Sequence, residues 1–448
     1  MTTPRPCATA PSFTHHLRAN RGGRHTVRDY LEDRLATLDA LEPSVGAFVC
    51  HDPEAARRAA DESDRRWRSG HPLSPIDGLP IGAKDIIYSA DFPTRLGTPR
   101  DWSPRPLIDA ACLQAIQEGG ALLLGKLTTT AFAIGGVSTQ TRNPHDLART
   151  PGGSSSGAAA AVGGGMLAAA FGTQTQGSLI RPASYCGTIA MKPTWGTLSV
   201  QGVHPVAHSL DHLGLMAGDL DDLQGLLGWL SVKAPGPGQA GRLLDDTPVA
   251  TPPRRIGVLL TSGTDELSDA SRTAFDQALE RVARQGVDVV TPTRHDSLKR
   301  LCEDLERVHR WSLQLIGLEM QWPYRQYLAD NDGSIDQRMI DLIDQGSRMS
   351  VSDARTLHEQ RLGLMARCDG LLEELDALVL PSASGPAPVG LASSGSRKNL
   401  VYATFLGLPC YSLPVMRVDD MPFGLQVIGQ RHRDVHLGNI ARWWLQHG

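Results

Sequence analysis

Glycine gathers in one short segment, and this segment limits most strongly what the chain can form. Eight of the 46 glycines lie between Gly152 and Gly177, interleaved with serine, threonine and alanine. Glycine adopts positive φ without strain and lets the backbone approach a ligand closely. A flexible Gly/Ser linker is the simple alternative, but the alanine-rich stretch 157–170 predicts a helix, and linkers do not usually begin helices. We therefore expect ordered backbone here, beside a binding site.

The composition is that of a folded protein without a strong charge of either sign. Of the 448 residues, 41% are hydrophobic, and 44 Lys and Arg against 48 Asp and Glu give a net charge of −4. These values exclude wholesale disorder and give no basic excess for binding nucleic acid. The longest weakly polar run, 157–172, is too short and too rich in Gly and Ala to span a membrane. Residues 1–23 hold no apolar core of a secretory signal.

The seven cysteines are scattered along the sequence and form no CxxC pair. Their spacing favours neither a disulfide framework nor a zinc ribbon. We therefore expect reduced, mostly buried thiols in a cytoplasmic protein. We expect neither a nucleic-acid partner nor a membrane partner.

Apolar spacing predicts strands that alternate with helices. The clearest unit is a βαβ pattern over 255–291, in which an amphipathic helix separates two short apolar strands. Such alternation predicts an α/β protein with a large central β-sheet, mixed and mainly parallel. The other expected elements are a helix that Thr26 caps and Pro43 ends, helices over 53–68, 108–118 and 157–170, a mainly helical region over 297–375, and strands over 78–85, 121–124, 377–380 and 424–428.

Three segments place nucleophile or base candidates beside glycines. They are GLPIGAKD (78–85), PGGSSSG (151–157) and GTQTQGSLIRPASYCG (172–187). A serine nucleophile needs a base, usually histidine, yet none of the 15 histidines lies in these segments. Lys84 is the alternative, and it would have to be buried and neutral, because an ordinary lysine has a pKa of about 10.4. Successive N–H groups near Ser178 would be able to bind an oxyanion.

Together these segments resemble the amidase signature family. The resemblance rests on Lys84 in GLPIGAKD, on Gly-Gly-Ser-Ser at 152–155 and on Ser178 followed by Arg181-Pro182, in this order. It covers roughly residues 25–445, with further matches at Asn143-Pro144, Ser209-Leu210-Asp211 and 422–429. It implies the amidase signature fold, an α/β structure with helices on both faces of the sheet.

The same resemblance implies a single domain over residues 1–448. Within it we expect an N-terminal helical segment at about 1–70 and a catalytic core at about 71–230 and 376–448. A βαβ plus helical region at about 250–375 would shape the substrate pocket.

The resemblance also implies a Ser-Ser-Lys triad. Ser178 matches the family's nucleophile, Ser154 its bridging serine in a cis peptide, and Lys84 its base. An acyl-enzyme on Ser178 follows from these roles. Four backbone N–H groups match the oxyanion hole, those of Thr175, Gln176, Gly177 and Ser178.

The implied activity is hydrolysis of a C–N acyl bond other than a peptide bond. The substrate would be a small-molecule amide or a carbamate (urethane), with an ester as a further class. We expect no cofactor, no metal, and a monomer or a homodimer. Two alternatives stay open: a protein like the A subunit of an amidotransferase, which releases ammonia within a complex, and a non-catalytic member of the same fold.

Some positions depart from the family's pattern or allow two interpretations. Gln176 stands where the family commonly has glycine, and Gln174 where it commonly has aspartate. Arg181 would either contact a substrate carboxylate or brace its own loop through an internal ion pair, and the ion-paired brace is the preferred interpretation. Ser155 and Ser156 fit helix capping better than catalysis.

Two other patterns are not expected to carry function. The segment Gly153–Gly157 matches the G-x-S-x-G nucleophile elbow, but turn-like residues precede it where that motif needs a strand. His204, His208 and His212 recur at intervals of four, as metal ligands on a helix would. Pro205 interrupts any regular helix there.

Overall fold

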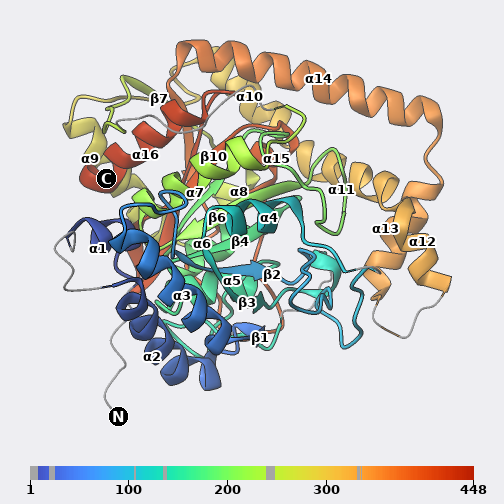
Figure 1. The fold of residues 1–448 in the computed structure, drawn as a ribbon. Coiled ribbons are helices and arrows are strands. Elements are labelled where there is room, and N and C mark those ends of the chain that lie inside the picture. Colours follow the sequence, from blue (N-terminus) through green and yellow to red (C-terminus); the bar gives the residue numbers. More distant parts are fainter. Residues whose placement is uncertain are drawn as a thin grey trace.

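A mixed β-sheet of eleven strands runs through the described part of the chain in the computed structural model (Figure 1). The structure describes residues 9–19, 26–104, 107–134, 139–238, 248–329, 333 and 335–448. Neighbouring strands follow the order β1-β3-β2-β4-β6-β5-β10-β11-β9-β7-β8. The strands are β1 Phe48–His51, β2 Pro80–Lys84, β3 Leu122–Leu127, β4 Ala169–Gln174, β5 Ile189–Lys192, β6 His212–Ala217, β7 Arg255–Val258, β8 Asp288–Val290, β9 Ala377–Pro381, β10 Cys410–Val418 and β11 Met421–Ile428.

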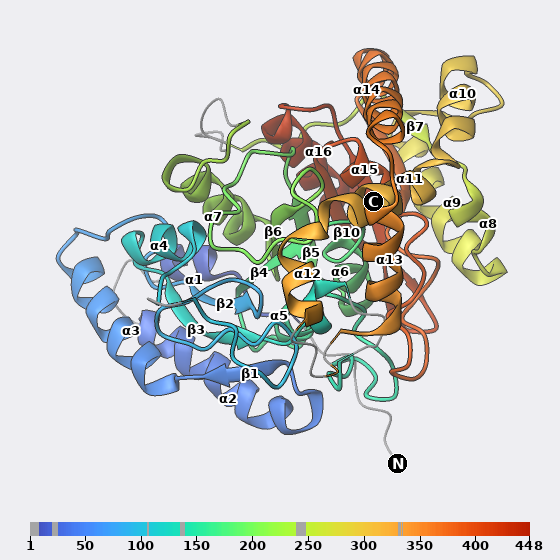
Figure 2. The same ribbon diagram turned by 90° about the vertical axis from the view of Figure 1, so that its right-hand side faces the viewer.

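Helices surround this sheet. Figure 2 shows α8, α9 and α10 on the opposite side of the molecule from α2 and α3, in keeping with β1 and β8 as the two edge strands. None of the helices in the described ranges has both the length and the apolar character needed to cross a membrane. The helices are α1 Phe13–Ala19, α2 Val27–Val45, α3 Pro53–Arg68, α4 Ala111–Glu118, α5 Ser156–Gly163, α6 Ile180–Cys186, α7 Leu220–Lys233, α8 Ser262–Asp265, α9 Asp269–Arg284, α10 Asp296–Leu305, α11 Val308–Glu319, α12 Gln321–Ala329, α13 Gln337–Ser347, α14 Val351–Glu374, α15 Val401–Phe405, α16 Asp434–His447 and the 3-10 turn η1 Ala131–Ala133.

The expected α/β fold with a mixed sheet is confirmed, but the sheet is not mainly parallel. Of the strand pairs among the described residues, six are antiparallel and four are parallel. One reason is the hairpin of β10 and β11, whose two turn residues, Asp419 and Asp420, have φ of 50° and 60°. A two-residue turn with positive φ at both positions joins antiparallel strands.

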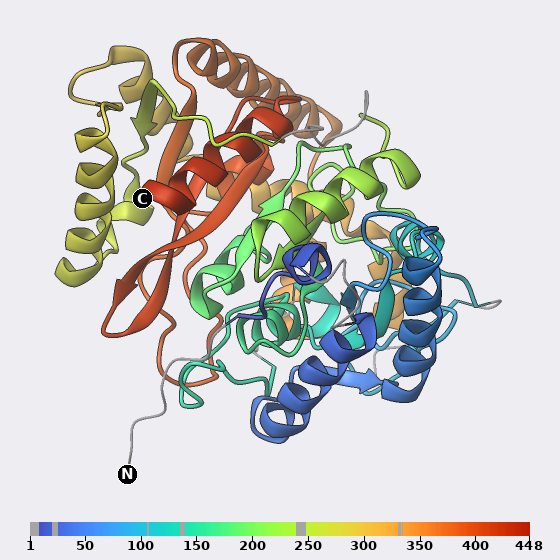
Figure 3. The same ribbon diagram turned by 60° about the vertical axis from the view of Figure 1, so that its left-hand side comes forward.

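Helices lie on both faces of the sheet, as expected. In β10 the Tyr411 hydroxyl lies beside Gly438 of α16, whereas the Ser412 hydroxyl lies beside Gly424, which in turn contacts Ser184 of α6. Successive residues of a strand point to opposite faces, so α16 and α6 cover opposite faces. Figure 3 shows α7 next to α16, on the same face.

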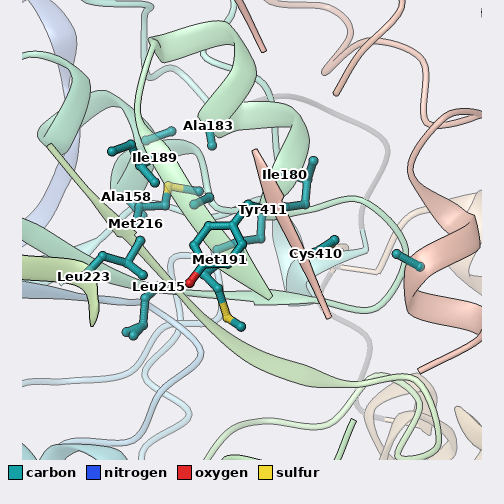
Figure 4. Close-up of a cluster of buried hydrophobic side chains, with 14 of the residues drawn as sticks. Ala158, Ile180, Ala183, Ile189, Met191, Leu215, Met216, Leu223, Cys410 and Tyr411 are labelled. Carbon is teal, nitrogen blue, oxygen red and sulfur yellow. The ribbon is translucent and has the colours of Figure 1, made fainter. Parts of the chain in front are cut away.

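The centre of the core lies at β6. Figure 4 shows Leu215 beside Leu223 of α7, and the next residue, Met216, beside Ala158 of α5. All four side chains are fully or almost fully buried. The strand is therefore apolar on both faces, which is typical of a central strand in an α/β sheet.

The βαβ pattern over 255–291 is confirmed. Ser268 caps α9 by accepting a hydrogen bond from Ser271 N–H, and the flanking strands β7 and β8 pair in parallel. The helix expected over 53–68 is α3, with Pro53 in its first turn. In both helices the N-cap residue can be recognised in the sequence. The start of each helix is therefore set by a local sequence signal.

Two expected helix ends are wrong. The helix expected over 157–170 ends at Gly163, and Ala169 and Ala170 belong to β4. A side chain at Gly163 would lie 2.3 Å from the Cys186 carbonyl oxygen, so this end of α5 packs directly on α6. Pro43 lies inside α2, which continues to Val45, because a proline in the last turn removes only one donor.

Candidate active site

Lys84 occupies the end of β2 with no exposed surface. Its Nζ donates to Ser154 Oγ at 2.7 Å and to Thr173 Oγ1 at 2.8 Å. Thr173 lies in β4, which pairs in parallel with β2, so the carboxyl ends of two neighbouring strands bring the two side chains together. No carboxylate of a described residue forms an ion pair with Lys84. Burial lowers the pKa of Lys84 to about 7, although the negative charge of Asp211 acts in the opposite direction.

Ser154 lies in a loop that several hydrogen bonds hold in place. The Gly153–Ser154 peptide bond is cis, as the family resemblance implies. Ser155 N–H donates to the Ser178 carbonyl at 3.1 Å, and Ser155 Oγ bridges the backbone N–H and C=O of Thr173 at 3.3 Å each. These bonds join the Ser154 loop to β4 and to the Ser178 turn.

Ser155 and Ser156 lie at a helix start, as expected, but the expected side-chain cap from Ser155 is absent. Helix α5 begins at Ser156 with Ser155 as its N-cap residue, but the Ser155 side chain makes no capping hydrogen bond. The Ser155 hydroxyl forms its hydrogen bonds with the backbone of Thr173 instead. Ser156 Oγ donates to the Gly152 carbonyl at 2.8 Å and so closes the glycine turn before Ser154.

Ser178 lies in the turn between β4 and α6 and is partly exposed. Together with Ser154 it lines a cavity of about 130 Å³. Within the described ranges, the Ser178 hydroxyl makes no hydrogen bond to the protein. Its hydroxyl is therefore open to a ligand, in a cavity that Ser154, the hydrogen-bond partner of Lys84, also lines.

The N–H groups of Thr175, Gln176, Gly177 and Ser178 are all available. None of them donates a hydrogen bond to another described residue. The four residues also line the cavity. A row of free backbone donors beside a hydroxyl is a suitable site for a developing oxyanion.

Two glutamines hold this turn in shape. Gln174 Oε1 accepts hydrogen bonds from Leu179 N–H and Ile180 N–H, each at 3.0 Å, and so satisfies the first donors of α6. An aspartate is also a side-chain acceptor for the first N–H groups of a helix. Gln176 Nε2 donates to Ser312 Oγ of α11 at 2.5 Å, and its Oε1 accepts from Arg397 at 2.7 Å.

Arg181 braces the loops around Ser154. Its Nη2 donates to the Gly153 carbonyl at 2.6 Å, and its Nη1 donates to the carbonyls of Gly395 and Ser396. The partners are carbonyl oxygens and not the carboxylate of an ion pair. Burial lowers the pKa of Arg181 to about 10. The observed contacts are those of a brace, but the expected internal ion pair is wrong, because the described partners of Arg181 are backbone carbonyls.

Asp211 lies behind the oxyanion turn. It accepts a hydrogen bond from Thr175 Oγ1 at 2.6 Å, and from the N–H groups of Val206 and Ala207 at 2.8 and 3.0 Å. Burial raises the pKa of Asp211 to about 6. The carboxylate therefore anchors Thr175 and is fully occupied by protein donors.

Sequence reasoning missed Thr173, Arg338 and Arg397. Thr173 stands in the same Gly-rich segment as Ser178, so its position was visible although its contact with Lys84 was not. Arg338 and Arg397 line the cavity from α13 and from the segment before α15. No local pattern marks either of them, since only the fold brings them to Ser178.

The histidines at 204, 208 and 212 do not converge. His204 Nε2 contacts the Tyr327 hydroxyl at 3.1 Å, His212 Nδ1 donates to the Leu210 carbonyl at 2.7 Å, and His208 lies 3.2 Å from Glu319. Nowhere in the described ranges do three or more His, Cys, Asp or Glu side chains form a group that could hold a metal ion. Six cysteines are free thiols, and Cys7 lies outside the described residues.

Comparison with known proteins gives consistent matches over most of the chain. A family model described as Amidase matches residues 29–437. The A subunit of glutamyl-tRNA(Gln) amidotransferase from Chloroflexus aggregans is 31% identical, with 91% of this chain and 90% of that protein covered. The AtzE subunit of 1-carboxybiuret hydrolase from a Pseudomonas species is 37% identical over 270 residues, which cover 57% of this chain and 58% of that one. A crystal structure described as an amidase has a TM-score of 0.84 at 27% identity and covers 98% of this chain and 100% of that chain.

Proposed function

Because the chain belongs to the amidase family and is an amidohydrolase acting on C–N bonds, we propose that it cleaves a small amide or carbamate through an acyl-enzyme on Ser178. The observation that carries this proposal is the buried hydrogen bond from Lys84 Nζ to Ser154 Oγ, together with the cavity that Ser154 and Ser178 line in common. A lysine with a pKa of about 7 is partly neutral at physiological pH and can accept a proton.

The proposed reaction begins with proton transfer along two hydroxyls. Neutral Lys84 takes the proton of Ser154, which takes the proton of Ser178 as Ser178 Oγ attacks the substrate carbonyl carbon. The N–H groups of residues 175–178 stabilise the negative charge on the carbonyl oxygen. The same relay then returns the proton to the leaving nitrogen, and the C–N bond breaks. Water enters, gives its proton to the relay and releases the acyl group from Ser178.

We propose that the substrate is a small molecule. The cavity of about 130 Å³ is small for a ligand site. An amide and a carbamate present the same carbonyl to Ser178, and an ester would react by the same steps. The relative named 1-carboxybiuret hydrolase supports a compact substrate with C–N acyl bonds.

A second candidate function comes from the similarity to the amidotransferase protein, which extends over 91% of this chain. That protein is named as one part of a larger enzyme, so the candidate requires partner chains. The two candidate functions differ in what the protein requires for catalytic activity. A hydrolase alone turns over substrate as the purified chain, whereas an amidotransferase component requires its partners, and its glutamine-dependent turnover would respond to ATP and acceptor.

The proposal is tested with matched aryl amide, carbamate and ester substrates of equal size. We expect the purified chain to hydrolyse at least one of them without ATP, and Ser178→Ala to lower kcat by at least about 10³-fold, as removal of a serine nucleophile does. Thr9→Ala is the control, because Thr9 does not line the cavity, and it should leave kcat unchanged. Turnover that survives Ser178→Ala, or that appears only with partner chains and ATP, would contradict the proposal.

A further inference from the structure

Three arginines line the cavity beside Ser178. They are Arg181, Arg338 and Arg397, and the lining residues in the described part of the chain include no aspartate or glutamate. Guanidinium groups that share a partly desolvated space repel one another and need a counter-charge. Among the described residues no carboxylate lies at the cavity wall, so a bound anion would supply the missing counter-charge.

Arg181 is the innermost of the three. Its side chain is almost fully buried, at 5% exposure, and all its observed partners are uncharged carbonyl oxygens. Its Nε–H finds no hydrogen-bond partner among the described residues. The brace therefore uses part of the guanidinium and leaves its charge uncompensated.

Arg397 lies next to the oxyanion turn. Its Nη1 donates to Gln176 Oε1 at 2.7 Å, and Gln176 stands two residues before Ser178. Burial, together with the positive charges of Arg338 and Arg181, lowers the pKa of Arg397 to about 9. Its position is electrostatically unfavourable in the empty site, and an anion would relieve it.

Arg338 lies in the first turn of α13, two residues after the N-cap residue Asp336. A cation at this end of a helix interacts unfavourably with the helix dipole, so helix stability does not explain it. Within the described ranges, the Arg338 side chain forms no hydrogen bond and no ion pair. Its guanidinium is free to bind a ligand in the cavity.

Three acidic groups near this region already have protein partners. Asp211 accepts three hydrogen bonds behind the oxyanion turn. Glu266 pairs with Lys398 at 2.7 Å, and Glu319 accepts from Ser209 N–H and lies 3.2 Å from His208. None of these three carboxylates lines the cavity.

We propose that the substrate carries a carboxylate, which Arg338 and Arg397 bind while Ser178 attacks the C–N acyl group of the same molecule. This inference rests on the amidase function proposed above and adds the substrate class. Guanidinium forks match the planar geometry of a carboxylate and bind it with two parallel hydrogen bonds. Because Arg397 contacts the oxyanion turn through one side chain, the carboxylate and the acyl carbon are separated by only a few bonds.

The first test uses the unaltered protein and pairs of small amides. Oxamate, malonamate and succinamate each carry one carboxylate and one amide, and the corresponding diamides replace the carboxylate with a neutral carboxamide of the same shape. We expect kcat/KM to be higher for the acid than for the diamide by at least about 10-fold at one of the three chain lengths, since hydrogen bonds to charged groups are the stronger ones. Equal values for acid and diamide at every length would overturn the proposal.

The second test asks whether Arg338 and Arg397 cause the preference for the acid. Arg338→Gln should lower kcat/KM for the preferred acid by about 10- to 100-fold and change that for its diamide by less than about 3-fold. Arg397→Gln also loses the hydrogen bond to Gln176, so it should lower both values, but the value for the acid by at least about 10-fold more than that for the diamide. Arg310→Gln is the matched control, because Arg310 lies on α11 and lines a separate cavity. A loss of the same factor on acid and diamide would reject the two arginines as carboxylate ligands.

Binding to Ser178→Ala separates this inference from the proposed function. We expect calorimetry to detect binding of the preferred acid, and Arg397→Gln in the same background to weaken it by at least about 10-fold. A fluorophosphonate probe that fails to label Ser178 in the unaltered protein would reject the nucleophile alone. Absence of any carboxylate binding by Ser178→Ala, with labelling of Ser178 intact, would reject the carboxylate site alone.

Discussion

We propose that Lys84 acts as the base, and its surroundings suit it to that role. Two buried lysines on adjacent strands show the contrast: Lys126 lies 3.0 Å from the Asp85 carboxylate, whereas Lys84 contacts only hydroxyls. A carboxylate partner favours the charged form of a lysine, and burial without one favours the neutral form. The absence of a carboxylate ligand on Lys84 within the described ranges is thus what makes it suitable for proton transfer.

This difference predicts the pH dependence of the reaction. Lys84 is neutral above its pKa, so kcat/KM should rise with pH through about 7 and then level off. Lys84→Met should abolish most of the activity. In the activity that is left, the rise of kcat/KM on the acidic side of the profile, here called the acidic limb, should be absent. The measurement is kcat/KM against pH across the neutral range, from well below to well above the pKa of Lys84, in buffers of constant ionic strength.

Lys192 provides the control for that profile. It is also buried, and burial lowers its pKa to about 8, but its Nζ donates to the carbonyls of Pro193 and Leu408. It does not line the cavity. Lys192→Met should leave the acidic limb in place. A profile that is flat across the same range, or a limb that persists in Lys84→Met, would remove Lys84 as the base.

At the scale of elements, the turn between β4 and α6 depends on Gln174. Its Oε1 accepts from two backbone donors and its Nε2 donates to Thr404 Oγ1 at 2.9 Å. Gln174→Ala would leave the Leu179 and Ile180 N–H groups buried without an acceptor. We expect the free energy of unfolding to fall by about 1–3 kcal/mol, measured by denaturant unfolding, together with a loss of kcat.

The matched control for this element is Gln314→Ala. Gln314 is exposed on α11, and its removal should change the free energy of unfolding by less than about 0.5 kcal/mol. A Gln174→Ala protein as stable as the Gln314→Ala protein would show that the side chain does not support the turn.

The elements that the sequence predicts well are those with local signals. Helix α2 begins after Thr26, whose side chain accepts from Asp29 N–H, and both residues are visible in the sequence. Strand β10 was missed because Pro414 interrupts it, at the point where the register with β11 shifts. The boundary between α5 and β4 was missed because alanine is compatible with both, and only the packing of Gly163 on α6 decides it.

In the candidate site, too, the residues that stand in local motifs are predictable from the sequence and the others are not. Lys84, Ser154 and Ser178 stand in recognisable motifs, and the fold brings Lys84 and Ser154 into contact as the family pattern implies. Arg338 and Arg397 stand in no motif. They reach the cavity because α13 packs against α11 and because Gln176 holds Arg397. Such convergence depends on tertiary structure, which no local pattern encodes.

At the scale of the whole molecule, we propose that the chain unfolds as one domain. Segments distant in sequence alternate in the sheet: β5 pairs with β10, and β9 lies between β11 and β7. Opening the 250–375 region would therefore expose an edge of the central sheet. We expect calorimetry to show one transition, with equal calorimetric and van't Hoff enthalpies. Two separate transitions, or a stable proteolytic fragment of residues 250–375, would contradict this.

The most direct test of the proposed mechanism is covalent labelling of the nucleophile. The purified protein is treated with a fluorophosphonate probe, digested, and mapped by mass spectrometry. We predict one modified serine, Ser178, with labelling that is slowed in Lys84→Met and absent in Ser178→Ala. Labelling of a different serine, or labelling that persists in Ser178→Ala, would contradict the mechanism.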